Sequence, residues 1–190
     1  PSMPLGIDTV KKLRKITNME FDVHIMSMNN ELFINEMLDI GAESITFHYE
    51  SSFHTDRLIN LVKRSGAKVG VALNPATSLS VLDYILPQCD SILLMLINPG
   101  FATDKGEKQV SYADKKVKDL SELIRKNNLD VKIQVDGRVS LETIPKLVSA
   151  GADSLVVGST SLFIPGNTIS ENKKLLDISI SEGLKGGNFN

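Results

Sequence analysis

The chain has 190 residues, of which 42% are hydrophobic and 23% charged, a composition typical of a folded globular protein rather than a disordered one. Its formal net charge is −2 and both signs are interspersed, which disfavours a nucleic-acid-binding or membrane-surface protein. No apolar run reaches the length of about 18 residues that a membrane span needs, no signal peptide is recognisable, and the single cysteine cannot form an intrachain disulfide, so we expect one cytosolic domain over residues 1–190.

Six apolar runs recur along the chain, and each ends in a short polar or glycine-bearing cluster before a helix-like stretch. A loop that leads into a helix, over residues 1–17, precedes them. The runs are Phe21–Met26, Ser44–Glu50, Lys68–Thr77, Ser91–Phe101, Val131–Arg138 and Ser154–Thr160. Near-continuous apolarity, as in VGVAL and SILLML, indicates strands that are buried on both faces, as in a parallel sheet covered by helices.

The stretches between these runs have the apolar spacing of helices. The clearest stripes cover residues 32–38, 58–62, 117–124 and 144–148. Gly41, Gly66 and Gly151 follow three of them, and a glycine after the last periodic residue is a typical helix stop. Ser78 and Ser140 predict helix starts.

The alternation of strands and helices predicts right-handed crossovers and one parallel sheet. Residues 40–48 (IGAESITFH) and 150–158 (AGADSLVVG) resemble each other, which favours a repeated β/α unit. Two architectures fit this pattern. One is an open, doubly wound sheet of six strands, and the other is a (β/α)8 TIM barrel of which only six strands are represented.

The ends of the predicted strands carry the residues with chemical potential. Asp22, His24 and Met26 alternate in DVHIM and therefore share one strand face. Taken alone, a histidine in a buried strand is usually a hydrogen-bonded core residue, and Met26 fits simple packing; a site is the alternative for both. Asp136 in QVDG is either a turn former or a catalytic carboxylate at a barrel strand end. His48 and Glu50 also share a face, as a structural pair or a site wall.

Two glycine-bearing strand ends predict loops around a site. Residues 158–160 (GST) close the last run, and backbone N–H groups at a helix start bind phosphate. In barrels such a phosphate site often follows the last two strands, which here end in QVDGR and VVGST. Residues 98–101 (NPGF) precede a polar stretch, which is typical either of a loop over a site or of an ordinary surface loop.

Together these strand ends resemble the ribulose-phosphate 3-epimerase family. The similarity rests on DVHIM, GAESITFHYE, KVGVALNPAT, LLMLINPGF, IQVDGR and GADSLVVGSTSLF, in this order and at near-family spacing from Pro1 to about residue 165. The resemblance implies a TIM barrel whose strands 3–8 are represented here. It implies that the first two strands, with a metal-binding histidine and one acid/base aspartate, precede Pro1, so that residues 1–190 are an N-terminally incomplete barrel domain.

The resemblance also implies an activity, which is epimerisation at C3 of a ketose phosphate through a 2,3-enediolate. D-ribulose 5-phosphate, converted to D-xylulose 5-phosphate, is the expected substrate. Asp136 would be one of two acid/base aspartates, and His24 and Asp136 would ligate one divalent metal ion, which a mixed N/O donor set suits as Zn, Fe, Mn or Co. Family members are often dimers or hexamers, so a homo-oligomer is expected.

The substrate residues implied by the resemblance come from four strand ends. They are His24, Met26, Met95, Gly100, Phe101, Ala102, Thr103, Gly137, Arg138, Gly158 and Ser159. Two departures from the family pattern concern substrate choice. Arg138 replaces a glycine, where a backbone N–H serves phosphate comfortably only at negative φ and the side chain could add positive charge instead. The loop after NPGF is longer than in the family.

These departures keep three other functions open. Allulose 6-phosphate is a rival substrate. The altered DGR and the longer loop also fit a barrel that binds a sugar phosphate without turning it over. A metal-free, phosphate-binding lyase or isomerase is the third possibility.

Overall fold

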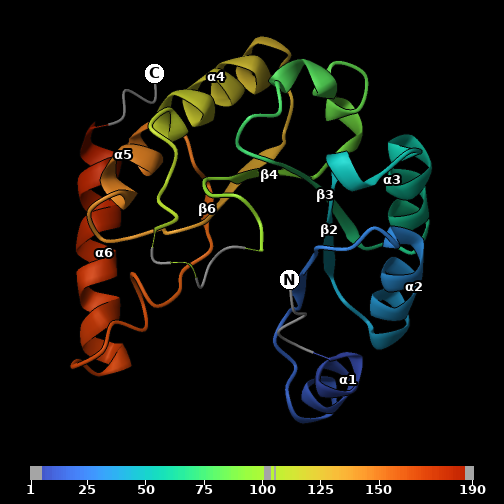
Figure 1. The fold of residues 1–190 in the computed structure, drawn as a ribbon, viewed down its shortest axis with the longest axis horizontal. Coiled ribbons are helices and arrows are strands. Elements are labelled where there is room, and N and C mark those ends of the chain that lie inside the picture. Colours follow the sequence, from blue (N-terminus) through green and yellow to red (C-terminus); the bar gives the residue numbers. More distant parts are fainter. Residues whose placement is uncertain (1–5, 101–103, 105, 187–190) are drawn as a thin grey trace.

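The protein, described here by a computed structural model that covers residues 6–100, 104 and 106–186, has an α/β fold. Within this part of the chain, six parallel strands form one sheet in the order β1-β2-β3-β4-β5-β6. The sheet curves into a half-barrel whose edges are β1 and β6 (Figure 1). The strands are β1 (Asp22–Ile25), β2 (Ser44–His48), β3 (Lys68–Leu73), β4 (Ser91–Met95), β5 (Lys132–Asp136) and β6 (Ser154–Leu155). Each predicted run therefore contains a strand, and the parallel pairing that the sequence predicts is confirmed.

Helices form an arc around the convex side of the sheet (Figure 1). They are α1 (Ile7–Ile16), α2 (Asn30–Ile40), α3 (Thr55–Arg64), α4 (Ala113–Lys126), α5 (Ile144–Ser149) and α6 (Ile169–Gly186). The three glycine stops are confirmed, because Gly41, Gly66 and Gly151 follow α2, α3 and α5 with φ of 85°, 86° and 112°. Only glycine adopts such left-handed angles without strain.

The segment between β3 and β4, which the structure describes in full, contains no α-helix, contrary to the expected pattern. It forms two 3-10 helices instead, η2 (Leu79–Leu82) and η3 (Leu86–Gln88). Ser78 does begin η2, and its hydroxyl accepts a hydrogen bond from the Ser80 N–H. Pro87 lies within the first two positions of η3. A single α-helix that began after Ser78 and continued through this segment would need a backbone N–H donor at position 87, which proline lacks.

The expected helix start at residues 158–160 is also wrong. The chain makes a turn there instead, in which the N–H groups of Ser161, Leu162 and Phe163 all donate to the carbonyl of Gly158. Helix α6 begins only at Ile169. Pro165 and Gly166, the latter at φ 93°, lie between the turn and the helix and explain why the helix does not begin earlier.

Alternation along each strand separates a helix-facing side from a concave side. Ile45 and Phe47 of β2 are fully buried in the large core that the sheet shares with the helices. The residues between and after them, Thr46 and His48, are buried but polar. Where the strands are apolar on both faces, as in β3 and β4, the concave side has its own small cluster, Ala72, Leu93 and Met95. The concave side therefore combines apolar walls with polar groups.

Three acidic side chains tie the strands together at their N-terminal ends. Each lies just before β2, β4 or β6, and its carboxylate accepts a hydrogen bond from a backbone N–H group at the start of the preceding strand. The bonds run from Phe21 to Glu43 at 2.7 Å, from Val69 to Asp90 at 2.8 Å and from Ile133 to Asp153 at 2.8 Å. This repeated contact explains the similarity of residues 40–48 and 150–158, and it leaves the C-terminal strand ends available for a site.

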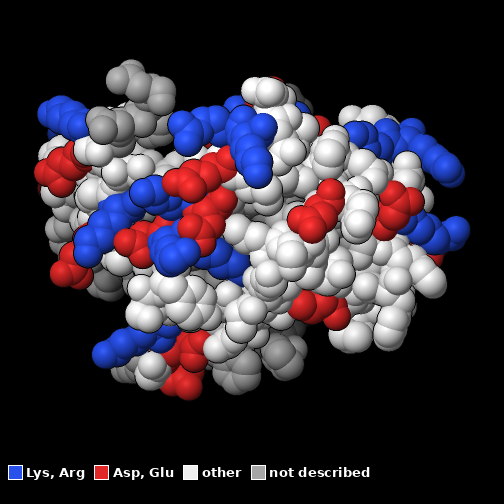
Figure 2. All heavy atoms as spheres, turned by 90° about the horizontal axis from the view of Figure 1, so that it is seen from above, with Lys and Arg blue, Asp and Glu red and all other residues white. Residues whose placement is uncertain are grey.

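The surface carries both signs of charge. On the face in Figure 2, basic and acidic side chains lie next to one another, in keeping with the net charge of −2. Among the helices of the described residues, none combines the length and the hydropathy needed to cross a membrane.

Candidate active site at the C-terminal strand ends

A pocket of about 200 Å3 opens at the C-terminal ends of β4, β5 and β6. Eight predicted site residues line it: Met26, Met95, Gly100, Asp136, Gly137, Arg138, Gly158 and Ser159. Three others, Phe101, Ala102 and Thr103, lie outside the described residues. His24 does not line the pocket but lies at its edge, beside Asp136.

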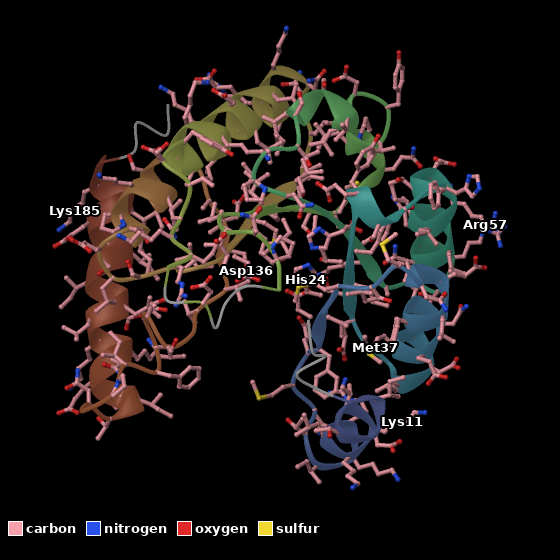
Figure 3. All side chains as sticks on the ribbon, in the orientation of Figure 1. Lys11, His24, Met37, Arg57, Asp136 and Lys185 are labelled. Carbon is pink, nitrogen blue, oxygen red and sulfur yellow. The ribbon has the colours of Figure 1, made fainter. Side chains whose placement is uncertain are left out.

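Asp136 and His24 face each other across the concave side of the sheet (Figure 3). Asp136 is the last residue of β5, and His24 lies near the end of β1, the edge strand. Their closest approach, from His24 Nδ1 to Asp136 Oδ2, is 3.8 Å. Further down the same face, Gln134 Nε2 donates to Asp22 Oδ2 at 2.7 Å and links the same two strands. The curvature of the sheet thus brings residues 112 positions apart into one site.

Two methionines form apolar walls of the pocket. Met95, at the end of β4, is buried, whereas Met26, which follows β1, is 53% exposed. Both sulfur-containing side chains lie in the lining of the pocket that Asp136 enters. A carboxylate between apolar walls interacts more strongly with a bound ligand than one in water, because the local dielectric constant is lower.

The donor pair of His24 and Asp136 fits part of a divalent metal site. Two donors that each lie about 2.1 Å from a zinc ion can be up to about 4.2 Å apart, so a separation of 3.8 Å is compatible with one shared ion. A nitrogen and a carboxylate oxygen also suit Fe, Mn or Co. The described residues contain no group of three or more histidine, cysteine, aspartate or glutamate side chains that could hold a metal.

Gly137 and Arg138 turn the chain sharply after β5. Gly137 has φ 116°, and Arg138 has φ 51°, so both residues lie in the left-handed region. The Arg138 amide therefore does not meet the condition of a negative φ, and of the two alternatives for this residue the positive side chain remains. A residue of another loop stabilises this turn: Gln109 Nε2 donates hydrogen bonds to the carbonyls of Gly137 and Arg138 at 2.9 and 3.0 Å. These two bonds help to offset the strain of a left-handed arginine, about 1 to 2 kcal/mol.

The Arg138 guanidinium connects this turn to the loop that follows β4. Its Nε donates to the Glu107 carbonyl at 3.2 Å, and one Nη donates to the Asp104 carbonyl. The Glu107 carboxylate in turn accepts from the backbone and side-chain N–H groups of Asn98, both at 2.9 Å. The Arg138 side chain therefore holds a loop beside the pocket.

The turn at residues 158–160 presents a different set of amides from the predicted one. The Gly158 N–H donates to Ser161 Oγ at 3.2 Å and is thus already engaged. Within the described residues, no protein acceptor lies within hydrogen-bonding distance of the Ser159 or Thr160 N–H. Thr160 Oγ1 donates to the Val139 carbonyl at 2.7 Å, which connects this turn to the one after β5.

The rest of the lining is Ile97, Pro99, Val139, Val156, Val157 and Thr160. Pro99 and Thr160 belong to the two loops that the sequence predicted around a site, whereas sequence reasoning missed the other four. These four are apolar, and nothing in the sequence distinguishes an apolar residue that lines a pocket from one in the core. His48 and Glu50, for which a structural pair and a site wall were both open, form a hydrogen-bonded pair at 3.3 Å.

Comparison with known proteins was made at the level of sequence and of fold. The family model described as "Ribulose-phosphate 3 epimerase family" matches residues 1–163. A ribulose-phosphate 3-epimerase of Methanocaldococcus jannaschii is 42% identical over 159 residues, which cover 84% of this chain and 66% of the relative. One of Escherichia coli is 36% identical over 186 residues, which cover 97% of this chain and 79% of the relative. The chain thus spans about two thirds to four fifths of these proteins.

Solved structures with the same fold are more distant in sequence. A 3-hexulose-6-phosphate synthase from Salmonella typhimurium aligns with a TM-score of 0.65 at 19% identity and covers 93% of this chain and 81% of that one. KGPDC from Streptococcus mutans aligns with a TM-score of 0.66 at 14% identity and covers 93% of this chain and 79% of that one. These likenesses concern the fold alone.

Proposed function

Because this chain belongs to the ribulose-phosphate 3-epimerase family, a family of isomerases, we propose that it inverts C3 of D-ribulose 5-phosphate to give D-xylulose 5-phosphate. The observation that carries this proposal is the position of Asp136. Its carboxylate ends β5 inside the pocket, 3.8 Å from His24, between methionine walls and next to the amides of a glycine-bearing turn. A carboxylate held in this way is a suitable base for a proton next to a ketone.

Asp136 acts in this proposal as one of two acid/base groups. Inversion requires that one group remove the C3 proton and that another return a proton to the opposite face of the sugar. The family resemblance assigns the second group to a segment ahead of Pro1, which is not among the 190 residues. Met26 and Met95 exclude water from the enediolate that forms when the proton leaves.

His24 and Asp136 would also hold the divalent metal that the family resemblance implies. Such an ion, when bound, supplies a Lewis acid that lowers the energy of negative charge on the substrate oxygens. The role of His24 is to present a nitrogen lone pair at a fixed position beside Asp136. The 3.8 Å between the two donors, and their mixed nitrogen and oxygen character, support this assignment.

The sugar phosphate would bind between the turns after β5 and β6. We assign this role to Gly137, Arg138, Gly158 and Ser159, with Gly100 on the loop after β4. Support comes from the Ser159 N–H, for which the described residues provide no acceptor, and from Arg138, which lies in the lining of the same pocket. Backbone amides and an arginine are the donors that phosphate groups prefer.

Proton NMR in D2O tests the reaction directly. The protein that carries this sequence, supplied with divalent metal, is incubated in turn with ribulose 5-phosphate and allulose 6-phosphate. We expect deuterium at C3 of ribulose 5-phosphate together with the epimer, because an enediolate exchanges its proton with solvent. Faster exchange with allulose 6-phosphate would instead identify a ketohexose phosphate epimerase. Sugar binding without exchange or product would contradict catalysis and favour a non-catalytic binding barrel.

Replacement of Arg138 by glutamine should weaken substrate binding more than it slows the chemistry. The variant keeps a side chain at φ 51° but loses the guanidinium that holds the Glu107 and Asp104 carbonyls. Loss of such charged hydrogen bonds, about 1.5 kcal/mol, predicts a roughly tenfold higher KM with a nearly unchanged kcat. Arg125→Gln, in the last turn of α4, is the matched control. Equal KM values for both variants would show that the loop contact does not matter.

Three further expectations stay predictions. The first is that the six strands take the third to eighth positions of one eight-stranded barrel domain, a proposal that the position of β1 and β6 at the edges of the described sheet supports. The second is a homo-oligomer, and the third is a cytosolic location.

A further inference from the structure

A chain of hydrogen bonds connects His24 to the next two strand ends, on the side of its ring away from Asp136. His24 Nε2 lies 2.9 Å from Nε2 of His48, the last residue of β2, and the two ring planes are inclined by 26° with centroids 4.9 Å apart. His48 Nδ1 lies 3.3 Å from Glu50 Oε2. These contacts use one nitrogen of His24 and both nitrogens of His48. They leave His24 Nδ1 as the atom that faces Asp136.

Glu50, in the short 3-10 helix η1 (Tyr49–Ser51), anchors this chain of bonds. Its Oε1 accepts from the Asn74 N–H at 2.7 Å and from the Thr77 hydroxyl, both in the loop after β3. Burial alone would raise the pKa of Glu50, but hydrogen bonds from His48, Thr77 and Asn74 outweigh it and lower the pKa to about 2. Glu50 is therefore a carboxylate, which can only accept hydrogen bonds.

The acceptor at Glu50 determines the direction of each bond in the chain. His48 has to donate from Nδ1, and the Nδ1-protonated tautomer of His48 has a lone pair on Nε2. This lone pair is the acceptor for His24, so His24 carries its proton on Nε2. The Nδ1 of His24 is then left with a lone pair, 3.8 Å from the Asp136 carboxylate.

We propose that His48 and Glu50 are positioning residues that hold the His24 ring in its Nε2-protonated form, with the Nδ1 lone pair presented beside Asp136. A histidine that ligates a metal usually has its other nitrogen bound in such a way, which orients the ring and makes it more basic. The use of the lone pair as a metal ligand rests on the proposed function. The hydrogen bonds and the orientation of the His24 ring are independent of that function.

This arrangement also couples the site to the packing of three adjacent strands. His24 lies near the end of β1, His48 ends β2, and the groups that donate to Glu50 Oε1 follow β3. The His48 side chain is only 6% exposed and that of Glu50 26%. Water therefore competes little for these bonds, and their loss leaves buried polar atoms without partners, which changes the preferred orientation of His24.

Nitrogen-15 NMR of the histidine rings in metal-free protein tests the positioning role. The chain has three histidines, so their signals are readily assigned. We expect wild-type His24 to be protonated on Nε2 and His48 on Nδ1. His48→Phe keeps an aromatic ring but removes the acceptor, so His24 should become a mixture of tautomers. His48→Gln supplies a carbonyl oxygen as acceptor and should restore the single form.

Two NMR outcomes would overturn the proposal. One is a wild-type His24 that is protonated on Nδ1. The other is an unchanged His24 signal in a folded His48→Phe variant. If that variant does not fold, Glu50→Gln provides a second test. The glutamine carbonyl must accept from the Asn74 N–H and the Thr77 hydroxyl, so its NH2 group faces His48 Nδ1, and an unchanged His24 signal would again overturn the proposal. His54→Gln is the control, since the His54 side chain caps no helix N–H, and it should leave His24 unchanged.

Calorimetric titration with Zn2+ or Mn2+ alone, without sugar, provides an independent readout. We expect His48→Phe to weaken cation binding by roughly 10- to 100-fold, and His54→Gln to have no effect. Equal affinity in wild type and His48→Phe would overturn the positioning role. A wild-type protein with the expected tautomers that binds no cation would support the positioning role and contradict the proposed metal. The two proposals can thus fail separately.

Discussion

Asp136→Asn is expected to lower kcat for ribulose 5-phosphate by roughly a thousandfold or more, because an amide can neither accept nor return the C3 proton. The substitution preserves the shape of the side chain. Among the described residues, the only partner of the carboxylate is His24, at 3.8 Å, so little structural change should follow. The thermal midpoint should therefore stay within about 2 °C of wild type, because no strong hydrogen bond is lost.

The loss of the proton-transfer step should be visible apart from product formation. In D2O, Asp136→Asn should incorporate no deuterium at C3, even at saturating sugar. The matched control is Asp130→Asn, an aspartate just before β5 whose side chain is 92% exposed and paired with Lys132. It should keep full activity. Wild-type turnover by a folded Asp136→Asn variant would refute the assignment of Asp136 as an acid/base group.

Gly137→Ala should damage both stability and turnover. A Cβ at this position, at φ 116°, would lie 2.8 Å from Ile97 Cγ1 and 2.9 Å from the Ile97 backbone nitrogen. The left-handed angle costs about 1 to 2 kcal/mol and the clash about 1 to 3 kcal/mol more, so the free energy of unfolding should fall by about 2 to 5 kcal/mol. Since Asp136 precedes this residue, a displacement of the turn should also lower kcat.

Two other glycines separate the causes of this effect. Gly166 has φ 93°, but no atom of the described residues lies within 4 Å of the point that an added Cβ would occupy, so Gly166→Ala should cost only the conformational strain, about 1 kcal/mol. Gly158 has neither a positive φ nor a close neighbour in the described part of the chain, so Gly158→Ala should leave stability unchanged. Urea unfolding of the three variants measures their free energies of unfolding and so ranks them by stability. Equal stability of Gly137→Ala and Gly166→Ala would show that the contact with Ile97 is not restrictive.

Much of the architecture follows from local pattern. Apolar runs such as Lys68–Leu73 become strands because both of their faces are buried, and Gly41 and Gly66 end helices because they adopt φ near 85°. The two places where the predicted helices fail have a local cause as well. Pro87 and the pair Pro165 and Gly166 interrupt helices, and this signal was present in the sequence.

For the site too, the sequence predicts some features and not others. Strand-end position alone predicts that Asp136 and Gly137 lie at one edge of the sheet, because the carboxyl ends of parallel strands share an edge. It does not predict that Arg138 binds the Glu107 and Asp104 carbonyls, because such contacts depend on the path of a loop. Nor does it predict that the Gly158 amide is engaged by Ser161.

By itself, the sequence determined the order and type of the strands, the family, and the side chains that we propose for the site, because these depend on periodicity and on short motifs. Only the tertiary structure decided which of these side chains meet. The curvature of the sheet brings His24 of β1 within 3.8 Å of Asp136 of β5, and the pairing of β1 with β2 places His48 Nε2 2.9 Å from His24 Nε2. Distances of this kind depend on the twist of all the strands and on the packing of the helices around them, and no short sequence motif specifies these.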